Sequence, residues 1–263
     1  MDKKTVGILT VATNHYIDYW HKLALSVEKN FDATYWDTTL HVFTSEIDKA
    51  QQIARNLHNC KVQVHQIPQY GWPEATLYRY RIFQQFGDSL DEELLMHLDA
   101  DMLVFRDIRE ELPINFKNDI CLVLHPGYYR PKGFKLVWFY STHPKVFISD
   151  IRMKSKVGAL GSWENREEYL AYVPRSARKN YVCGGTWFGK NLAFKRLLDE
   201  LAVIEMRDTS KNLIPVWHDE SILNKWSSQN HPTLLSPSYC YDPTYPQLFG
   251  LPEYIRAVDK GSI

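Results

Sequence analysis

The sequence predicts an α/β fold with a mainly parallel central sheet and helices on both faces. In the first half of the chain, short apolar segments alternate with stretches whose apolar residues recur every three or four positions. Parallel strands joined by helices produce this alternation. The 263 residues show no internal repeat, low-complexity segment or linker, and they can bury a core without disulfides. We therefore expect one domain with two halves, about 1–124 and about 125–263.

The expected elements follow one another along the chain. Strands are expected at 6–11, 40–43, 61–67, 93–98 and 120–124. Helices are expected at about 20–31, 47–57, 75–86 and 194–201, and from about 219 onward. Ser45 and Asp48 resemble a capping box that would begin the helix at 47–57. Between 126 and 180 the periodicity is interrupted by Pro, Gly, Tyr, Lys and Arg, so we expect binding loops there.

Charge and cysteine content exclude several classes of protein. The 31 basic and 31 acidic residues cancel, so a general polyanion-binding surface is not indicated. No Cys-x-x-Cys pair is present, so a zinc site is not expected. We find no secretory signal and no apolar stretch long enough to span a bilayer. We expect a cytoplasmic protein with no transmembrane segment, for which any membrane attachment is peripheral.

Two carboxylates, Asp99 and Asp101, follow the apolar strand expected at 93–98. Alternate side chains of an extended chain share a face, so both can converge beyond the carboxyl end of the strand. Hard oxygen ligands at that place suit Mg²⁺ or Mn²⁺ carrying a phosphate-bearing substrate. The alternatives are a solvated acidic turn and an Asp-x-Asp phosphatase, although Ala100–Leu103 lacks the Gly-Thr continuation of such phosphatases. The 8 Trp and 16 Tyr also permit a catalytically silent glycan-binding protein.

Several strings, taken in order and spacing, carry a resemblance to a known family. They are residues 72–80 (WPEATLYRY), 98–102 (LDADM), 124–129 (LHPGYY), 181–185 (YVCGG), 217–225 (WHDESILNK) and 235–239 (LSPSY). In this combination the chain resembles glycosyltransferase family 6, which includes the histo-blood-group A and B transferases, the α-1,3-galactosyltransferases and shorter microbial members. The resemblance runs over nearly the whole chain.

The resemblance implies a retaining enzyme with the Rossmann-like GT-A fold. Such an enzyme moves galactose or N-acetylgalactosamine from its UDP donor onto the 3-hydroxyl of an acceptor galactose. The family's acceptors are β-galactosides, some of which need a 2-linked fucose. No nucleic acid partner is implied. The first half of the chain would then bind the nucleotide, and the second half would bind the acceptor and carry catalysis.

On the donor side, the resemblance implies that Asp99 and Asp101 hold Mn²⁺ (or Mg²⁺) against the UDP diphosphate. Some bacterial relatives have asparagines there and work without metal, so the retained carboxylates predict metal dependence. Arg79 would reach the metal motif and the nucleotide; the alternative is a solvated helix arginine, with Arg81 as a confusing neighbour. The uracil would be cradled by three residues after the first strand: Val11, Ala12 and Tyr16. Tyr16 could equally be an ordinary half-buried aromatic residue.

Glu220 matches the carboxylate beneath the anomeric carbon, and Asp219 matches a residue that holds hydroxyls of the donor sugar. Glu220 could form a covalent intermediate or stabilise an oxocarbenium-like centre, and the sequence does not choose between them. The alternative for both acids is a favourable interaction with a helix dipole. On the acceptor side the resemblance implies Trp217, His125 and Asp242, with core packing as the alternative for Trp217.

Three residues fall where family members set donor choice: Cys183, Gly184 and Gly185. Small residues there leave room for an N-acetyl group, so we expect UDP-N-acetylgalactosamine, although Trp187 could refill the space. The alternative is a glycine turn that needs positive φ. Lys260 resembles the start of a C-terminal segment that closes over the diphosphate.

Overall fold

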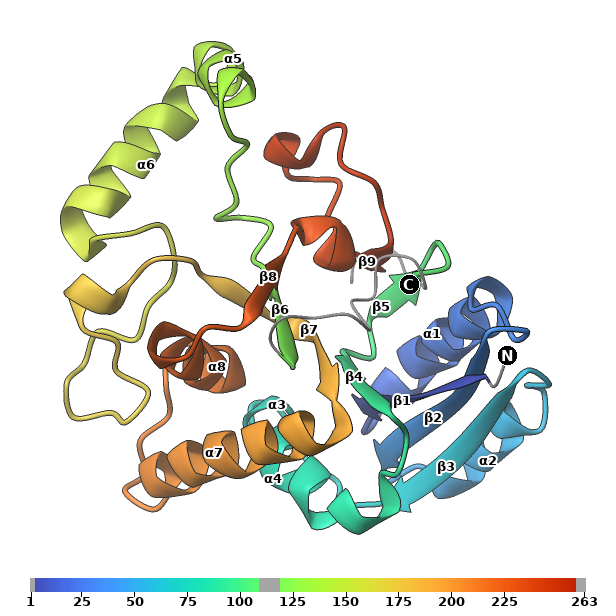
Figure 1. Cartoon of the computed structure of the whole chain (residues 1–263). Helices are drawn as coiled ribbons and strands as arrows, with labels where there is room; N and C mark the ends of the chain where they lie inside the picture. The colour runs from blue at the N-terminus through green and yellow to red at the C-terminus, as the bar shows by residue number, and fades with distance from the viewer. Residues whose placement is uncertain (1–2, 109–118, 259–263) are drawn as a thin grey trace.

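A computed structural model describes residues 3–108 and 119–258. Its centre is a seven-stranded sheet with the strand order β3-β2-β1-β4-β7-β6-β8, beside a pair formed by β5 and β9 (Figure 1). The strands are β1 Lys4–Val11, β2 Trp36–Thr44, β3 Cys60–Gln66, β4 Leu94–Leu98, β5 Met102–Val104, β6 Ile120–Leu124, β7 Val182–Lys190, β8 Thr233–Leu235 and β9 Ile255–Ala257. β7 runs antiparallel to both of its neighbours, and the other neighbouring pairs of the large sheet are parallel. The expectation of a mainly parallel α/β sheet is confirmed.

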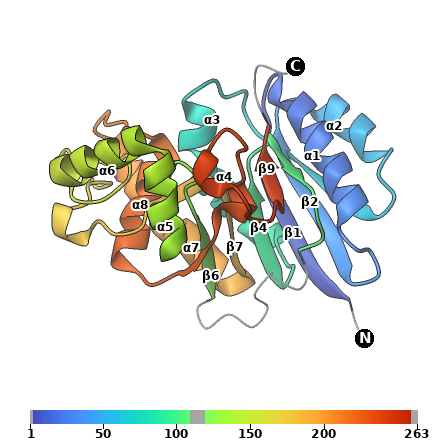
Figure 2. The same cartoon turned by 90° about the horizontal axis from the view of Figure 1, so that it is seen from above.

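Two separate apolar cores cover the two faces of this sheet. The helices are α1 Tyr16–Asn30, α2 Ile47–Ala54, α3 Glu74–Leu77, α4 Arg79–Gln85, α5 Phe134–Thr142, α6 Pro144–Val157, α7 Asn191–Thr209 and α8 His218–Gln229. Adjacent residues of a strand point to opposite faces. Ile8 and Met96 therefore join the core under α1 and α2, while Leu9 and Leu95 join the core under α4, α7 and α8. Figure 2 shows these helical layers on either side of the strands.

Several local expectations differ from the structure. The helix expected at 75–86 is divided at Tyr78 into α3 and α4. The capping box of Ser45 is not formed; α2 begins at Ile47, and the Glu46 N–H donates to Thr44 Oγ1 at 2.9 Å. The segment from 126 to 180 contains two helices, α5 and α6, which project from the sheet as a pair (Figure 1). The expectation of loops is therefore wrong for these two helices. Their apolar residues face outward and do not mark a buried core.

Within the described ranges, no helix has the length and apolar character needed to cross a bilayer.

Candidate active site

The antiparallel course of β7 brings together segments that are distant in the sequence. β4 ends at Leu98, which pairs with Thr186 in the middle of β7. The Asp99 N–H then donates to the Gly185 carbonyl at 3.0 Å. The acidic pair therefore lies beside the glycines of the 181–185 string, at the carboxyl end of the parallel strands, where open α/β sheets bind their ligands.

Helix α8 is fixed to the same strand by a side-chain amide. Asn224 accepts a hydrogen bond from the Val182 N–H at 2.9 Å and donates to the Val182 carbonyl at 2.8 Å. The first turn of α8 thus faces Gly184, whose N–H donates to Glu220 Oε2 at 2.9 Å. Asn224 takes the place of a backbone partner for Val182, the first residue of β7. It therefore helps to position Glu220 without lining the cavity.

Gly184 and Gly185 lie in extended strand, so the alternative of a positive-φ glycine turn is wrong. The two glycines allow close approach instead. A Cβ on Gly184 would lie 3.0 Å from Asp219 Oδ2, and a Cβ on Gly185 would lie 2.8 Å from Asp99 Oδ2. A side chain at either position would therefore displace a carboxylate of the site.

The two neighbours of these glycines point into the protein. Trp187 is fully buried and stacks on Phe194 with ring centroids 4.6 Å apart, so it does not refill the space beside the glycines. Cys183 is buried in the core under α1, where its thiol donates to the Thr186 carbonyl at 4.0 Å. Of the three residues assigned to donor choice, only the two glycines reach the cavities.

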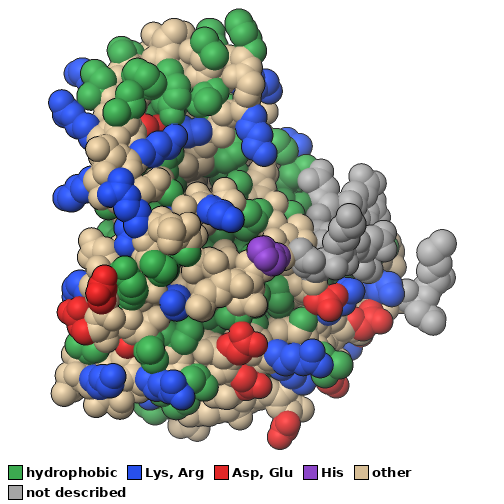
Figure 3. Space-filling model, turned by 60° about the vertical axis from the view of Figure 1, so that its left-hand side comes forward, with side chains coloured by type: hydrophobic (Ala, Val, Ile, Leu, Met, Phe, Trp, Pro, Cys, Tyr) green, Lys and Arg blue, Asp and Glu red, His purple; other side chains and the backbone are tan. Residues whose placement is uncertain are grey.

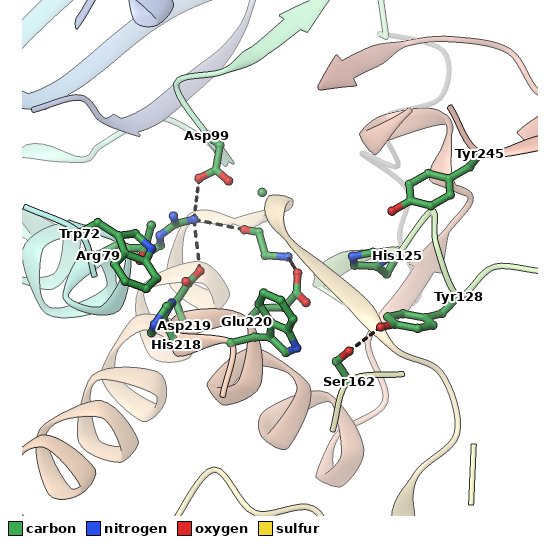
Figure 4. A pocket seen from close by; sticks show the side chains of 14 residues that line it. Trp72, Arg79, Asp99, His125, Tyr128, Ser162, His218, Asp219, Glu220 and Tyr245 are labelled. Atoms are coloured by element: carbon green, nitrogen blue, oxygen red, sulfur yellow. Dashed lines mark hydrogen bonds and ion pairs between the residues drawn. The ribbon is translucent and has the colours of Figure 1, made fainter. Parts of the chain in front are cut away.

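Arg79 is the electrostatic centre of the site. Its Nη1 lies 2.8 Å from Asp99 Oδ1 and 3.3 Å from Asp219 Oδ2, and it donates to the Gly184 carbonyl at 3.3 Å (Figure 4). Arg79 is buried, so the alternative of a solvated helix arginine is wrong. The neighbouring Arg81 lies over the Tyr78 ring, with its guanidinium carbon 3.6 Å from the centroid.

His97 contacts the Arg79 guanidinium inside the protein, and the sequence did not single it out. The Nε2 atom of His97 lies 2.6 Å from Arg79 Nη1, and its Nδ1 lies 3.0 Å from the Leu9 carbonyl. The carbonyl accepts only if Nδ1 carries the proton, so Nε2 accepts from the guanidinium. This histidine therefore links β1, β4 and Arg79, and its signal was its place on the buried strand before Asp99.

Burial shifts the pKa values of the two acids at the start of α8 towards neutral pH. Removal from water raises the pKa of Glu220 to about 7, although the Gly184 N–H bond acts in the opposite direction. Burial also raises the pKa of Asp219 to about 6, although the Arg79 charge acts against it. Such strongly shifted groups, gathered at one cleft beside a charged partner, are typical of functional sites. The alternative of a simple helix-dipole interaction does not explain this arrangement.

A first cavity of about 370 Å³ joins these charged groups to an aromatic wall. Asp99, Arg79, Asp219 and Glu220 line one side of it, and the sequence-predicted His125 and Trp217 line it as well. Figure 4 shows His125, Tyr128 and Tyr245 across the cavity from Asp99 and Arg79. Lining residues that sequence reasoning did not assign are Trp72, Thr76, Tyr128, Ser162, His218 and Tyr245. Four of these lie within the strings that carried the resemblance, and that was their only signal.

Two acceptor-side candidates differ in their surroundings. Burial lowers the pKa of His125 to about 4, and its Nδ1 accepts from the Gly127 N–H at 3.0 Å. The ring is therefore neutral at pH 7 with its proton on Nε2, which can donate to a hydroxyl. Asp242 is outside the lining of this cavity; its Oδ1 accepts from the N–H and hydroxyl of Thr244.

A second cavity of about 320 Å³ adjoins the first and shares Arg79 and Asp99 with it. It is lined by the predicted Val11 and Tyr16, and also by Asp101. Ala12 lies behind this wall, fully buried, where its carbonyl accepts from Thr44 Oγ1. Asn14 and Tyr70, which the sequence did not single out, also line this cavity. Lys260 lies outside the described residues.

The acidic pair fits a divalent cation that is shared with a phosphate-bearing ligand. Asp99 and Asp101 line the same cavity as Arg79, and the Asp99 side chain is 33% exposed. In the described part of the chain no three His, Cys, Asp or Glu side chains are grouped to hold a metal alone. A cation here would therefore take its remaining ligands from substrate phosphate and water, as Mg²⁺ commonly does.

Comparison with known proteins decides the family. Residues 1–261 match the description Glycosyltransferase family 6. The chain belongs to this family. This family 6 glycosyltransferase is similar to the O-antigen biosynthesis glycosyltransferase WbnI of Escherichia coli, with 27% identity over 243 residues, which are 91% of this chain and 89% of WbnI.

The family 6 enzyme is also similar to two histo-blood group ABO system transferases of Rattus norvegicus. Identity is 22% with transferase 1 and 22% with transferase 2, over 97% and 96% of this chain. The chain spans 65% and 67% of the length of these two rat proteins. A glycosyltransferase takes a nucleotide-sugar donor and a glycan acceptor, so the phosphatase interpretation of the acidic pair is abandoned.

Proposed function

We propose that this family 6 enzyme transfers N-acetylgalactosamine or galactose from a UDP donor to the 3-hydroxyl of an acceptor galactoside, in α linkage and with retention. One observation carries the proposal. The acidic pair, Arg79 and Glu220 lie around two adjoining cavities that together offer a charged end and an aromatic end. A sugar nucleotide and a glycan need these two environments side by side.

On the donor side, the second cavity would take the nucleotide. Val11 and Tyr16 would contact the uracil, and the diphosphate would lie towards Asp99 and Asp101. A divalent cation, Mn²⁺ or Mg²⁺, would be held by these two acids and would supply Lewis-acid neutralisation of the departing diphosphate. Arg79 adds a planar guanidinium that binds phosphate oxygens or orients the acids.

Glu220 would act on the face of the sugar opposite the leaving phosphate. Only its ionised form can attack the anomeric carbon or stabilise positive charge there, and both routes to retention remain compatible with its position. A pKa of about 7 means that this group loses its proton near neutral pH. Asp219, one residue earlier and paired with Arg79, would hold hydroxyls of the donor sugar.

Two features of the first cavity support the sugars that we propose: small residues for the donor sugar and a flat aromatic side chain for the acceptor sugar. Gly184 and Gly185 line the first cavity, and a side chain at either position would displace Asp219 or Asp99, so the two small residues favour N-acetylgalactosamine. Trp217 offers an apolar platform for galactose, and His125 offers a hydrogen-bond donor. The four cysteines are free thiols, which supports a reducing compartment such as the cytoplasm.

The decisive experiment is an acceptor array. The purified enzyme is incubated with UDP-N-acetylgalactosamine or UDP-galactose, Mn²⁺ and β-galactosides with and without a 2-linked fucose, and the product linkage is read by NMR. We expect an α-1,3 product, loss of transfer in a chelator and recovery with added Mn²⁺. A β-linked product would overturn retention, and full activity in the chelator would give the aspartates another role. Acceptor binding without any transfer would establish the glycan-binding alternative.

A further inference from the structure

An unusual apolar stripe covers the outer surface of α5 and α6. Phe134, Val137 and Trp138 on α5 share one face at helical spacing, and Phe147, Ile148 and Ile151 share one face of α6. These six side chains are between 44% and 82% exposed. Large apolar residues gathered on a surface mark an interaction site, whereas scattered ones need no explanation.

The same hairpin, defined here as residues 130–157, carries a concentrated positive charge. Its basic residues are Arg130, Lys132, Lys135, Lys145, Arg152, Lys154 and Lys156, and its only acidic residue is Asp150. The whole chain, by contrast, has a formal net charge of zero. Figure 3 shows hydrophobic side chains gathered at the top of the molecule, over α5 and α6, with Lys and Arg around their margins.

The single acid of the hairpin is used internally. Asp150 is buried and receives two hydrogen bonds from the Arg130 guanidinium, at 2.6 and 2.7 Å, and one from the Tyr140 hydroxyl at 2.8 Å. This bidentate pair joins α6 to the segment that leads into α5. The other six basic side chains are exposed, and no acidic residue within the hairpin reaches the surface to oppose them.

We propose that the hairpin is a docking face for an anionic lipid bilayer. Helices whose outward face combines Trp, Phe and Ile with flanking lysines lie in the membrane interface, with the apolar side chains at the acyl boundary and the cations among the headgroups. Each Lys or Arg near an anionic surface strengthens binding by about fivefold. A second copy of this chain would place two positively charged faces together, so it does not fit this surface.

The docking face also leads towards the catalytic cleft. A third cavity of about 440 Å³ is lined by Arg152 and Lys156 of α6 together with Ser162 and Trp217. The last two also line the first cavity, on the side that we assign to the acceptor. Resting on that proposed function, the orientation would present the acceptor side of the cleft to a glycan carried at the membrane surface.

The binding experiment measures no transfer, so it stands apart from the proposed function. The purified protein is sedimented with phosphatidylcholine vesicles that contain 30% phosphatidylglycerol or none. We expect at least tenfold tighter binding to the anionic vesicles, weakened by salt. An apolar variant (Phe134→Ser, Trp138→Ser, Ile148→Ser) and a charge variant (Lys135→Glu, Lys145→Glu, Lys154→Glu) should each lose at least tenfold. No binding of the parent protein to anionic vesicles would overturn the proposal.

Matched controls use α7 and its end, where residues of the same kind are exposed away from the hairpin. Leu192→Ser with Met206→Ser, and Arg196→Glu with Arg207→Glu and Lys211→Glu, should change vesicle binding by less than twofold. Equal loss in these controls would show non-specific adhesion and overturn the assignment. Bromine-labelled lipid should quench the parent's tryptophan fluorescence, and Trp138→Phe should bind equally while losing most of that quenching. Unchanged quenching in Trp138→Phe would contradict the predicted orientation.

Discussion

The cleft has a charged wall and an aromatic wall, and the two are held in place by different means. On the charged wall, Arg79 is buried and bridges Asp99 and Asp219, while Glu220 accepts a backbone hydrogen bond. The aromatic wall is made of the rings of His125, Tyr128, Tyr245 and Trp217, which line the same cavity, and Trp217 is 51% exposed. Preorganised charges act on the reacting centre, whereas an exposed ring contributes contact area. Under the proposed function, we therefore expect the chemical step to depend on the first wall and acceptor affinity to depend on the second.

The strongest test of this contrast is Glu220→Gln. The amide keeps the shape and can still accept from the Gly184 N–H, but it carries no charge for the anomeric carbon. We expect kcat to fall by about 1000-fold or more, with the KM for the donor within about threefold. Steady-state kinetics with both substrates measure this.

The exposed Glu168→Gln serves as the matched control and should leave kcat unchanged. A Glu220→Gln enzyme with parental kcat would remove this carboxylate from the mechanism, and with it the chemical role of the charged wall.

The complementary change on the aromatic wall is Trp217→Ala. Loss of the indole platform should raise the KM for the acceptor by about tenfold and leave kcat within about threefold, because the ring contacts the acceptor without acting on the reacting bond. Trp138→Ala removes an exposed indole that lines neither of the two cavities, and it should change neither constant in a membrane-free assay. A fall in kcat with an unchanged acceptor KM would contradict the division between the walls.

The sheet could be predicted because its apolar residues mark a core on both faces. Strands such as β1 and β4 place apolar residues in the cores on both faces, and α1 carries its stripe towards one of them. The α5–α6 pair was missed because its apolar stripe points to the surface, where the same spacing usually indicates a buried face. β7 was missed because Gly184 and Gly185 resemble a turn, although they are extended to admit neighbouring carboxylates.

The sequence predicted those site residues whose side-chain type itself indicates a chemical role. Asp99, Arg79 and Glu220 carry charge in recognisable strings, and the fold brings them together. His97 and Asn224 act through buried hydrogen bonds to Arg79 and to the Val182 backbone. The sequence places His97 on a buried strand and Asn224 in the 217–225 string, but it does not reveal these bonding partners. Asp242, which the resemblance implies on the acceptor side, accepts from Thr244 and stays a prediction.

The smallest expected effect concerns stability, and it separates the walls without substrate. Burial raises the pKa of Glu220 from 4.5 to about 7, so between these values the folded protein binds more protons than the unfolded chain, and stability falls as pH rises. Glu220→Gln removes this cost and should raise the free energy of unfolding at pH 8.5 by up to about 3 kcal/mol, but by little at pH 5. Asp219 titrates in the same direction in both proteins, so their difference isolates Glu220. Urea unfolding at the two pH values measures it. Trp217→Ala should show no such pH-dependent difference, and an equal gain at pH 5 and pH 8.5 in Glu220→Gln would show that packing, rather than a buried charge, distinguishes the charged wall.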